Sequence, residues 1–377
     1  MLGTFEHEWK KIVDEYNSLK SENGLIHDDL LKALINPESN LVIFGAGAIG
    51  SGFGHSLGDL SHKLVAFCDN YKIGFLDKFS IPIISPTQLI HNYPNSIIAI
   101  CVNDVYGHND EIFEQLISLG ISKDKIFRRY SAYEQYDLED FKKLHLEGYK
   151  WAYEFFNDEH SKHILLNRLK SYLFFIEMPH SPLREQYFEQ NAIQFTDNEV
   201  FIDAGCYIGD TALEFVKRME GKYLHIYGFE PDYGNYLKAI NNLSEYKNIN
   251  VTNSGLYNKT ETLLFNSETA ASSINELGSV EISVVSLDDF YSQESRLAPT
   301  FIKMDIEGSE KQALIGAKRI IQETLPKLAI CVYHKPEDIY VLPKIINEYG
   351  DYEFTLRHYS SGAWETVLYA NPKKIKG

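Results

Sequence analysis

Val200-Phe-Ile-Asp-Ala-Gly-Cys-Tyr-Ile-Gly-Asp-Thr211 is the stretch that decides the fold of this chain. An apolar, β-rich run ends in Asp203, the chain passes through Gly205 and Gly209, and a helix-like pattern begins at Thr211. A strand that breaks at glycines and continues as a helix lets a ligand approach bare backbone at a helix N-terminus. The stretch therefore predicts a ligand-binding turn in an α/β domain.

The acidic residue in this turn indicates the kind of ligand. The spacing Asp-x-Gly-x-x-x-Gly differs from the Gly-x-Gly-x-x-Gly fingerprint of dinucleotide-binding folds. Asp203 at the strand tip would repel a pyrophosphate but suits a cationic cofactor without phosphate, and S-adenosylmethionine has a positive amino group and sulfonium. We expect Asp203 to accept a hydrogen bond from that amino group, directly or through water. The amides around Cys206–Gly209 would hold the cofactor carboxylate.

A second carboxylate follows the next predicted strand. Glu230 ends that strand in Tyr-Gly-Phe-Glu-Pro-Asp, where it can accept hydrogen bonds from both ribose hydroxyls, and Pro231 fixes the turn behind it. Asn253-Ser254 follows the third strand and is expected to reach the adenine edge. The predicted cofactor-binding residues are Asp203, Gly205, Cys206, Tyr207, Gly209, Asp210, Thr211, Glu230, Pro231, Asn253 and Ser254.

Charged residues end another apolar strand, Phe301-Ile-Lys-Met-Asp-Ile-Glu-Gly-Ser-Glu310. Strand alternation places Lys303, Asp305 and Glu307 on one side, and charges at the end of a buried strand are costly unless they are paired or functional. We expect Asp305 to border the methyl donor or to position the acceptor. Lys303 is expected to neutralise Asp305, with a direct catalytic role as the alternative.

His334 lies just after the following strand and should open onto the same cleft as Asp305. A neutral imidazole there could take a proton from a hydroxyl acceptor. Asp305, Glu307 and His334 could instead hold a divalent cation that acidifies the hydroxyl. A purely structural histidine is the third alternative, so Lys303, Asp305, Glu307 and His334 stand as catalytic candidates.

Residues from about 187 to 370 resemble the FkbM family of S-adenosylmethionine-dependent methyltransferases. The resemblance rests on Phe-Ile-Asp-Ala-Gly-Cys-Tyr-Ile-Gly-Asp-Thr, Gly-Phe-Glu-Pro-Asp, Val-Ser-Leu-Asp-Asp-Phe, Ile-Lys-Met-Asp-Ile-Glu-Gly-Ser-Glu and Glu-Thr-Val-Leu-Tyr-Ala, in that order. It implies O-methylation, often on sugars or polyketides, and hence a small-molecule or glycan acceptor. Cys206 and Tyr207 replace the Ala-Asn common in the family, so contacts to the methionine end of the cofactor are expected to differ.

An earlier glycine-rich turn fits a different cofactor. Gly45-x-Gly47-x-x-Gly50 follows a strand, and Asp69 lies at the end of the next strand, which is the spacing of a dinucleotide fingerprint. Residues 40–130 contain no Tyr-x-x-x-Lys pair for hydride chemistry. This unit resembles small Rossmann-like modules of sugar-processing proteins. It could bind NAD or a nucleotide-sugar, as in an oxidoreductase, or serve as a non-catalytic scaffold in glycan assembly.

The predicted organisation has four parts. N-terminal helices occupy 1–38, a small Rossmann-like α/β domain 39–130, a helical linker or lid 131–183, and a methyltransferase domain 184–377. In the last part, parallel strands with helical crossovers end in two strands joined by a short segment, which predicts an antiparallel hairpin. The expected fold is thus a class I methyltransferase doubly wound sheet, preceded by a smaller α/β domain.

Composition limits the partners. The net charge of −17 argues against nucleic acid and anionic membranes, and no apolar run approaches the length of a membrane span. The four cysteines are far apart and form no Cys-x-x-Cys pair, which indicates reduced thiols. We expect a cytoplasmic protein, and self-association into a homo-oligomer is left open.

Overall fold

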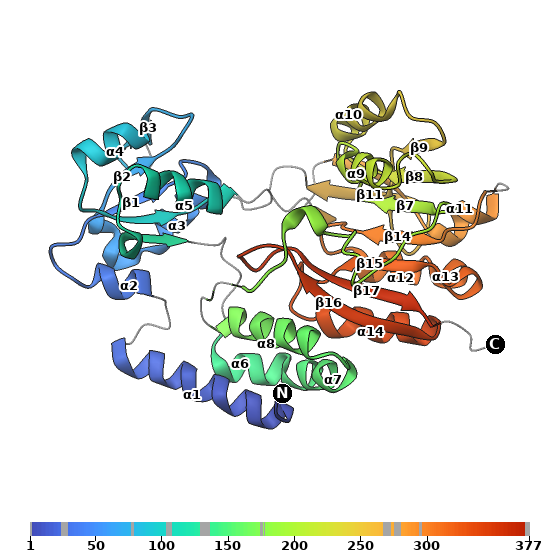
Figure 1. The fold of residues 1–377 in the computed structure, drawn as a ribbon, viewed down its shortest axis with the longest axis horizontal. Helices are drawn as coiled ribbons and strands as arrows, with labels where there is room; N and C mark the ends of the chain where they lie inside the picture. The colour runs from blue at the N-terminus through green and yellow to red at the C-terminus, as the bar shows by residue number, and fades with distance from the viewer. Residues whose placement is uncertain are drawn as a thin grey trace. The chain divides into compact units, whose positions relative to one another are not determined.

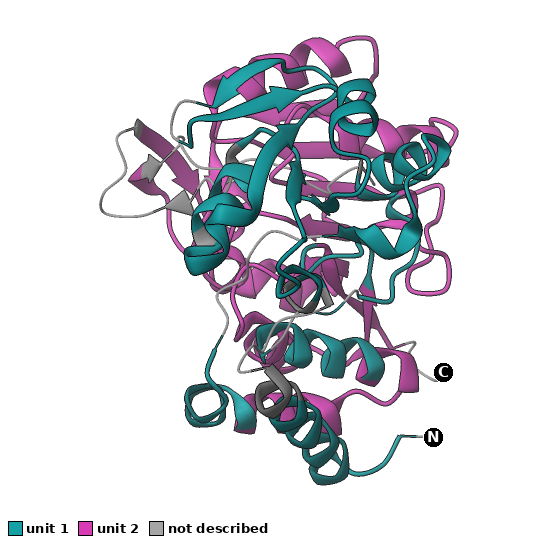
Figure 2. Cartoon of the chain, turned by 90° about the vertical axis from the view of Figure 1, so that its left-hand side faces the viewer, with its two compact units in different colours: residues 1–146, 163–183, 358–364 teal, residues 147–162, 184–357, 365–377 magenta. Residues whose placement is uncertain are grey.

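The protein is described from a computed structural model. The structure describes residues 2–23, 29–76, 79–102, 108–128, 136–173, 176, 178–266, 273–274, 280–293 and 296–373. The expected boundary at 130/131 lies outside these ranges. Two compact units emerge: unit 1 contains 1–146, 163–183 and 358–364, and unit 2 contains 147–162, 184–357 and 365–377 (Figure 2).

Unit 1 contains a six-stranded sheet in the order β3-β4-β2-β1-β5-β6. Its neighbouring strands pair in parallel, except that β3 and β4 are antiparallel. The strands are β1 (Leu41–Phe44), β2 (Leu64–Cys68), β3 (Gly74–Leu76), β4 (Ile81–Ile84), β5 (Ile97–Ile100) and β6 (Ile126–Arg128) (Figure 1). Sequence analysis missed β3 and β4.

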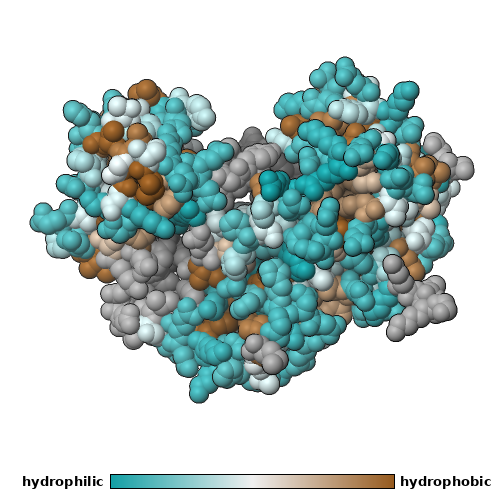
Figure 3. All heavy atoms as spheres, in the orientation of Figure 1, coloured by the Kyte–Doolittle hydropathy of each residue, from teal (hydrophilic) through white to brown (hydrophobic). Residues whose placement is uncertain are grey.

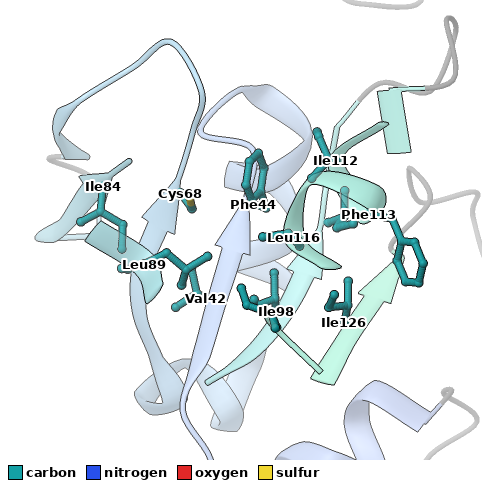
Figure 4. Close-up of a cluster of buried hydrophobic side chains, with 13 residues drawn as sticks. Val42, Phe44, Cys68, Ile84, Leu89, Ile98, Ile112, Phe113, Leu116 and Ile126 are labelled. Carbon is teal, nitrogen blue, oxygen red and sulfur yellow. The ribbon is translucent and has the colours of Figure 1, made fainter. Parts of the chain in front are cut away.

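Alternation along the strands of unit 1 builds one core on each face of the sheet. Val42 and Phe44 of β1 pack on the face covered by α4 (Pro86–Asn92) and α5 (His108–Ser118), as the close-up in Figure 4 shows. Leu41 and Ile43 point to the other face, against α2 (Asp29–Leu34) and α3 (Ala48–Ser56). Because both faces are covered, these strands are apolar throughout, as is usual for parallel sheets.

Helices make up much of the remaining chain before residue 183. The unit boundaries cross this region, because residues 147–162 group with unit 2 and residues 163–183 with unit 1. The helices are α1 (Phe5–Asn23), α6 (Leu138–Leu144), α7 (Leu146–Phe155) and α8 (Glu159–Leu173). Helices α6, α7 and α8 lie in the segment expected to be a helical linker or lid.

Unit 2 is built on a seven-stranded sheet in the order β16-β17-β15-β14-β7-β8-β9. Strand β17 is antiparallel to β15, and the pairs from β15 to β9 are parallel. The predicted doubly wound sheet with an antiparallel end is therefore confirmed. The strands are β7 (Val200–Ala204), β8 (His225–Phe229), β9 (Ile249–Thr252), β14 (Phe301–Met304), β15 (Lys327–Cys331), β16 (Tyr352–His358) and β17 (Thr366–Pro372).

Unit 2 also contains a separate four-stranded sheet, ordered β10-β13-β11-β12. Its strands are β10 (Gly255–Leu256), β11 (Glu261–Asn266), β12 (Ser273–Ile274) and β13 (Val280–Val285). The remaining helices of unit 2 are α9 (Asp210–Arg218), α10 (Tyr233–Leu243), α11 (Leu287–Gln293), α12 (Glu310–Ile315), α13 (Lys318–Thr324) and α14 (Asp338–Tyr349).

The visible surface in Figure 3 is largely hydrophilic, with smaller hydrophobic patches. Within the described ranges, no helix combines the length and apolar character that crossing a membrane requires. All four cysteines, Cys68, Cys101, Cys206 and Cys331, are free and buried, which agrees with the expectation of reduced thiols.

Candidate active site at the strand ends of unit 2

The glycine turn after β7 is tied to β8 by its own backbone. Gly205 and Cys206 both donate their amides to the carbonyl of Phe229 at 3.0 Å, and Gly209 donates to Cys206 at 2.7 Å. With the Tyr207 amide, which donates to Glu230, three of the amides of Cys206–Gly209 that were expected to face the cofactor are thus used inside the protein. The first amides of α9, at Asp210 and Thr211, lack intrahelical acceptors because of their position and remain suited to a carboxylate.

Glu230 lies directly after β8 and is held by two amides. Its carboxylate accepts one hydrogen bond from Tyr207 and one from Asp232, each at 2.9 Å. Each oxygen keeps a second lone pair, so the group can still accept two ribose hydroxyls. Burial raises the pKa of Glu230 to about 7, against the lowering effect of the two amides. These features fit the predicted ribose contact.

Asp203 forms a buried ion pair with Lys303. The two side chains, on neighbouring strands β7 and β14, are 0% and 2% exposed and lie 3.1 Å apart. Burial raises the pKa of Asp203 to about 6, even though Lys303 lowers it. Lys303 was expected to neutralise Asp305, but Asp203 is its partner in the ion pair. Full burial favours a supporting role for both residues over direct contact with the cofactor or the acceptor.

Asn253 and Ser254 support the turn that carries Glu230. The Asn253 amide donates to the carbonyls of Glu230 and Pro231 at 2.9 and 3.1 Å. The buried Ser254 hydroxyl donates to the carbonyls of Gly255 and Ser283. The expected contact with adenine therefore has less support from these side chains than the ribose contact has from Glu230.

Asp305 is fixed beside the glycine turn. A Cβ added at Gly205, whose φ is +71°, would lie 1.9 Å from the carbonyl oxygen of Asp305. The Asp305 carboxylate accepts hydrogen bonds from the hydroxyls of Tyr187 at 2.8 Å and Tyr333 at 3.0 Å. Burial opposes ionisation, but the charges of Lys303 and His334 and the two hydroxyls hold the pKa of Asp305 below its ordinary value.

His334 is surrounded by carboxylates. Its Nε2 lies 3.5 Å from Asp305 and 3.4 Å from Glu307, and its Nδ1 lies 3.0 Å from Glu310. Burial would lower the pKa of the imidazole, but Glu310, Glu307 and Asp305 together raise it well above its ordinary value. These surroundings favour the protonated ring in the protein without ligands, in contrast to the neutral imidazole expected from the sequence.

Left-handed backbone conformations gather around this cluster. Tyr187, Glu307 and Glu365 have φ values of +65°, +54° and +67°, and Tyr207 in the glycine turn has +49°. Such conformations are unfavourable for residues other than glycine and persist where the surrounding structure imposes them, often at functional sites. They support a functional role for this edge of the sheet.

Sequence reasoning missed several members of the cluster. Tyr187 contacts Asp305 across 118 residues of chain, and no local pattern announces it. Glu310 lies within the quoted motif but received no role, although its carboxylate faces the histidine. Burial also raises the pKa of Asp338 and of Glu365, so this region is rich in acidic groups.

The glycine turn of unit 1 has a different environment. The Asp69 carboxylate accepts the amides of Ala46 at 3.0 Å, Tyr71 at 2.9 Å and Lys72 at 3.1 Å. A Cβ at Gly45 would lie 2.4 Å from the carbonyl of Cys101, and one at Gly50 would lie 1.9 Å from Gly45, whereas Gly47 faces open space. Close packing accounts for glycine at positions 45 and 50, and the backbone hydrogen bonds account for the acidic residue at position 69. No bound nucleotide is needed to explain these three residues.

Comparison with known proteins identifies the domain. Residues 203–354 match the model of the methyltransferase FkbM domain. The chain is similar to the crystal structure of methyltransferase FkbM from Methylobacillus flagellatus KT, at 25% identity and a TM-score of 0.66, over 96% of this chain and 99% of that one. No curated protein matches the chain.

Two further solved structures match about half of the chain. A precorrin-6y C5,15-methyltransferase from Geobacter metallireducens GS-15 is 11% identical, with a TM-score of 0.34, over 51% of this chain and 88% of that one. Fibrillarin from Aeropyrum pernix, with natively bound S-adenosyl-L-methionine, is 12% identical, with a TM-score of 0.33, over 48% and 70%. The family match over residues 203–354 identifies this segment as a methyltransferase domain of the FkbM family, and the chain as an S-adenosylmethionine-dependent methyltransferase.

Proposed function

We propose that this enzyme methylates a hydroxyl group of a carbohydrate or glycoconjugate. The observation that carries the proposal is the direct contact between the glycine turn and the acidic cluster, with Gly205 packed against the backbone of Asp305. The predicted cofactor residues and the proton-accepting groups thus lie at the same edge of one sheet. The FkbM resemblance, which implies methylation of hydroxyls, supports the acceptor class.

The chain's own residues would bind the donor and receive a proton. Glu230 would accept the ribose hydroxyls, and the first turn of α9 would hold the cofactor carboxylate. When bound, S-adenosylmethionine supplies a methyl group whose C–S bond breaks as the C–O bond forms, the bonding electrons passing to sulfur. The acceptor hydroxyl is a weak acid, so its proton must leave during transfer. The carboxylates of Asp305 and Glu307, which lie beside His334, are the candidate groups to receive it.

The test uses methyl-labelled S-adenosylmethionine with monosaccharides, nucleotide-sugars and glycolipids as acceptors, and mass spectrometry to locate the new methyl group. We expect a methyl ether on one acceptor class. His334→Ala should lower kcat about a hundredfold or more with little change in cofactor affinity, because it removes the ring between the Asp305 and Glu307 carboxylates, and positioned bases contribute about that much. Methylation only at nitrogen or carbon, or near-normal turnover in His334→Ala, would contradict the proposal.

A matched control for these variants is Glu323→Gln. Glu323 lies on α13, its side chain is 56% exposed, and it pairs only at the surface with Arg319. Its substitution removes one carboxylate from the same domain outside the acidic cluster, so kcat should stay close to that of the unmodified enzyme. A loss comparable to that of His334→Ala would mean that general charge effects, not the cluster, explain the result.

The two alternatives from the sequence receive no support. The dinucleotide-dependent oxidoreductase required Asp69 to bind a ribose, but that carboxylate accepts three backbone amides. The non-catalytic scaffold is disfavoured by the match of residues 203–354 to a methyltransferase domain. We assign the chemistry to unit 2 and propose no cofactor for the glycine turn of unit 1.

A further inference from the structure

The acidic cluster contains buried polar atoms without hydrogen bonds. The His334 side chain is 6% exposed, and in the described part of the chain neither of its ring nitrogens makes a hydrogen bond of acceptable geometry, although carboxylate oxygens lie 3.0 to 3.5 Å away. Oε2 of the buried Glu310 also has no hydrogen-bond partner among these residues. Buried polar groups are normally satisfied, so these atoms are candidates to bind an ion or a polar ligand.

The distances fit the ligands of a metal ion. Oxygen and nitrogen ligands lie about 2.0–2.2 Å from Mg²⁺, Mn²⁺ or Zn²⁺, so adjacent ligands are about 3.0–3.5 Å apart in octahedral or tetrahedral sites. Nε2 of His334 lies 3.5 Å from Asp305 and 3.4 Å from Glu307. A group of ligand atoms within 4.8 Å of one another is formed by Asp305, Glu310 and His334, so Glu310 belongs to the same cluster, although Glu307 is not in this group.

The surroundings resemble those of a preorganised metal site. Metal-binding histidines usually donate their other N–H to a carboxylate, and Glu310 faces Nδ1 while its own Oε1 accepts the Ile306 amide at 2.8 Å. Metal-binding carboxylates are themselves hydrogen-bonded, as Asp305 is by Tyr187 and Tyr333. Glu307, with its side chain 41% exposed, leaves one side open to water or to an acceptor.

We propose that unit 2 binds one divalent cation through Nε2 of His334 and the carboxylates of Asp305 and Glu307. With the cation bound, Glu310, 3.0 Å from Nδ1, would hold the ring by accepting a hydrogen bond from Nδ1. Two carboxylates, one imidazole and an open side suit Mn²⁺ or Mg²⁺, which favour oxygen ligands and retain water. The cation's role in acidifying the acceptor hydroxyl rests on the proposed function, but its binding does not.

The test is a titration of the metal-stripped full chain with Mn²⁺ alone, in which electron paramagnetic resonance measures the free ion. We expect one bound Mn²⁺ per chain, displaced by excess Mg²⁺. Glu307→Gln and His334→Ala should weaken binding at least about tenfold, and Glu310→Gln about ten- to a hundredfold, as loss of a carboxylate behind a histidine ligand does. Glu323→Gln should bind as the unmodified protein does.

Two results would overturn the proposal: no Mn²⁺ binding at millimolar concentration, or equal binding in all these variants. Binding of S-adenosylhomocysteine to the same samples shows whether each variant is folded. If hydroxyl methylation proceeds after complete metal removal and no Mn²⁺ binds, the cation site is refuted while the proposed function stands. If Mn²⁺ binds through these residues but no hydroxyl is methylated, the cation site stands and the proposed function fails.

Discussion

Replacing Lys303 with methionine tests the buried ion pair that underlies the glycine turn. Lys303 is 2% exposed, lies 3.1 Å from Asp203, and also donates to the carbonyls of Ala204 and Gly205 at 3.2 and 2.7 Å. Removing one partner of a buried pair costs about 3–5 kcal/mol, because the other charge is left uncompensated. Lys303→Met should therefore destabilise unit 2 by about that amount at neutral pH.

Native-state hydrogen exchange of β7 and β14 amides measures this loss where it occurs. A cost of about 3–5 kcal/mol corresponds to exchange about 150- to 5,000-fold faster, at 1.36 kcal/mol per factor of ten. The penalty should shrink as the pH falls, because protonation of Asp203 removes the buried charge. Asp203→Asn combined with Lys303→Met should recover much of the loss.

The control is Lys222→Met, which breaks a surface pair. Lys222 and Glu220 lie 3.3 Å apart with side chains 57% and 77% exposed, and exposed pairs contribute about 0–1 kcal/mol. Exchange in Lys303→Met within about tenfold of the unmodified protein would refute the reasoning. In that case Asp203 would be neutral or otherwise compensated in the native state.

Four further predictions concern the cofactor turn and the acidic cluster. Burial raises the pKa of Glu230 to about 7, and ribose hydroxyls bind its ionised form, so the Kd for S-adenosylhomocysteine should fall about tenfold from pH 6 to pH 8. A Kd that does not change with pH in calorimetry would contradict this prediction. The unfolded chain ionises this group at lower pH, near 4.5, so the unliganded protein should lose stability as the pH rises from about 4.5 to about 7, and less so in Glu230→Gln. Gly205→Ala should destabilise the protein by more than the roughly 1–2 kcal/mol that a left-handed alanine costs, because the added Cβ would overlap the carbonyl of Asp305. The control Gly221→Ala, at φ +73° with open space around the position, should cost only about that conformational free energy. Equal midpoints of the two variants in denaturant unfolding would be evidence against the close contact. Tyr187→Phe removes one hydroxyl that donates to Asp305, and in steady-state kinetics it should lower kcat about tenfold or more with the KM for the cofactor unchanged. An unchanged kcat would mean that Tyr187 has no role in the site.

The strands that carry the site could be predicted because their sequences are unambiguous. β7 and β14 are short apolar runs that end in charged and glycine residues, and the structure places their ends side by side in register. β3 and β4 were missed because Ile-Pro-Ile-Ile contains a proline and β3 is only three residues long, with weak strand character. Such short strands form because the sheet edge supplies their hydrogen bonds.

Side-chain partners were harder to predict than strands. Alternation correctly placed Lys303 near the acidic groups, but register with β7 decided that Asp203, not Asp305, is its partner. The role of Tyr187 depends on a contact between residues 118 positions apart. The protonation of His334 depends on three carboxylates converging in space, one of which, Glu310, belongs to the following helix.

Calorimetric titration with S-adenosylmethionine tests the central claim, that unit 2 binds the methyl donor at the turn after β7 through Glu230. The account predicts one site per chain, retained in His334→Ala and largely lost in Glu230→Ala. Unliganded Glu230→Ala should remain folded, and saturation at a hundred times Kd should stabilise the unmodified protein by about 2.7 kcal/mol. Absence of binding at millimolar concentration, or an unchanged Kd in Glu230→Ala, would contradict the account.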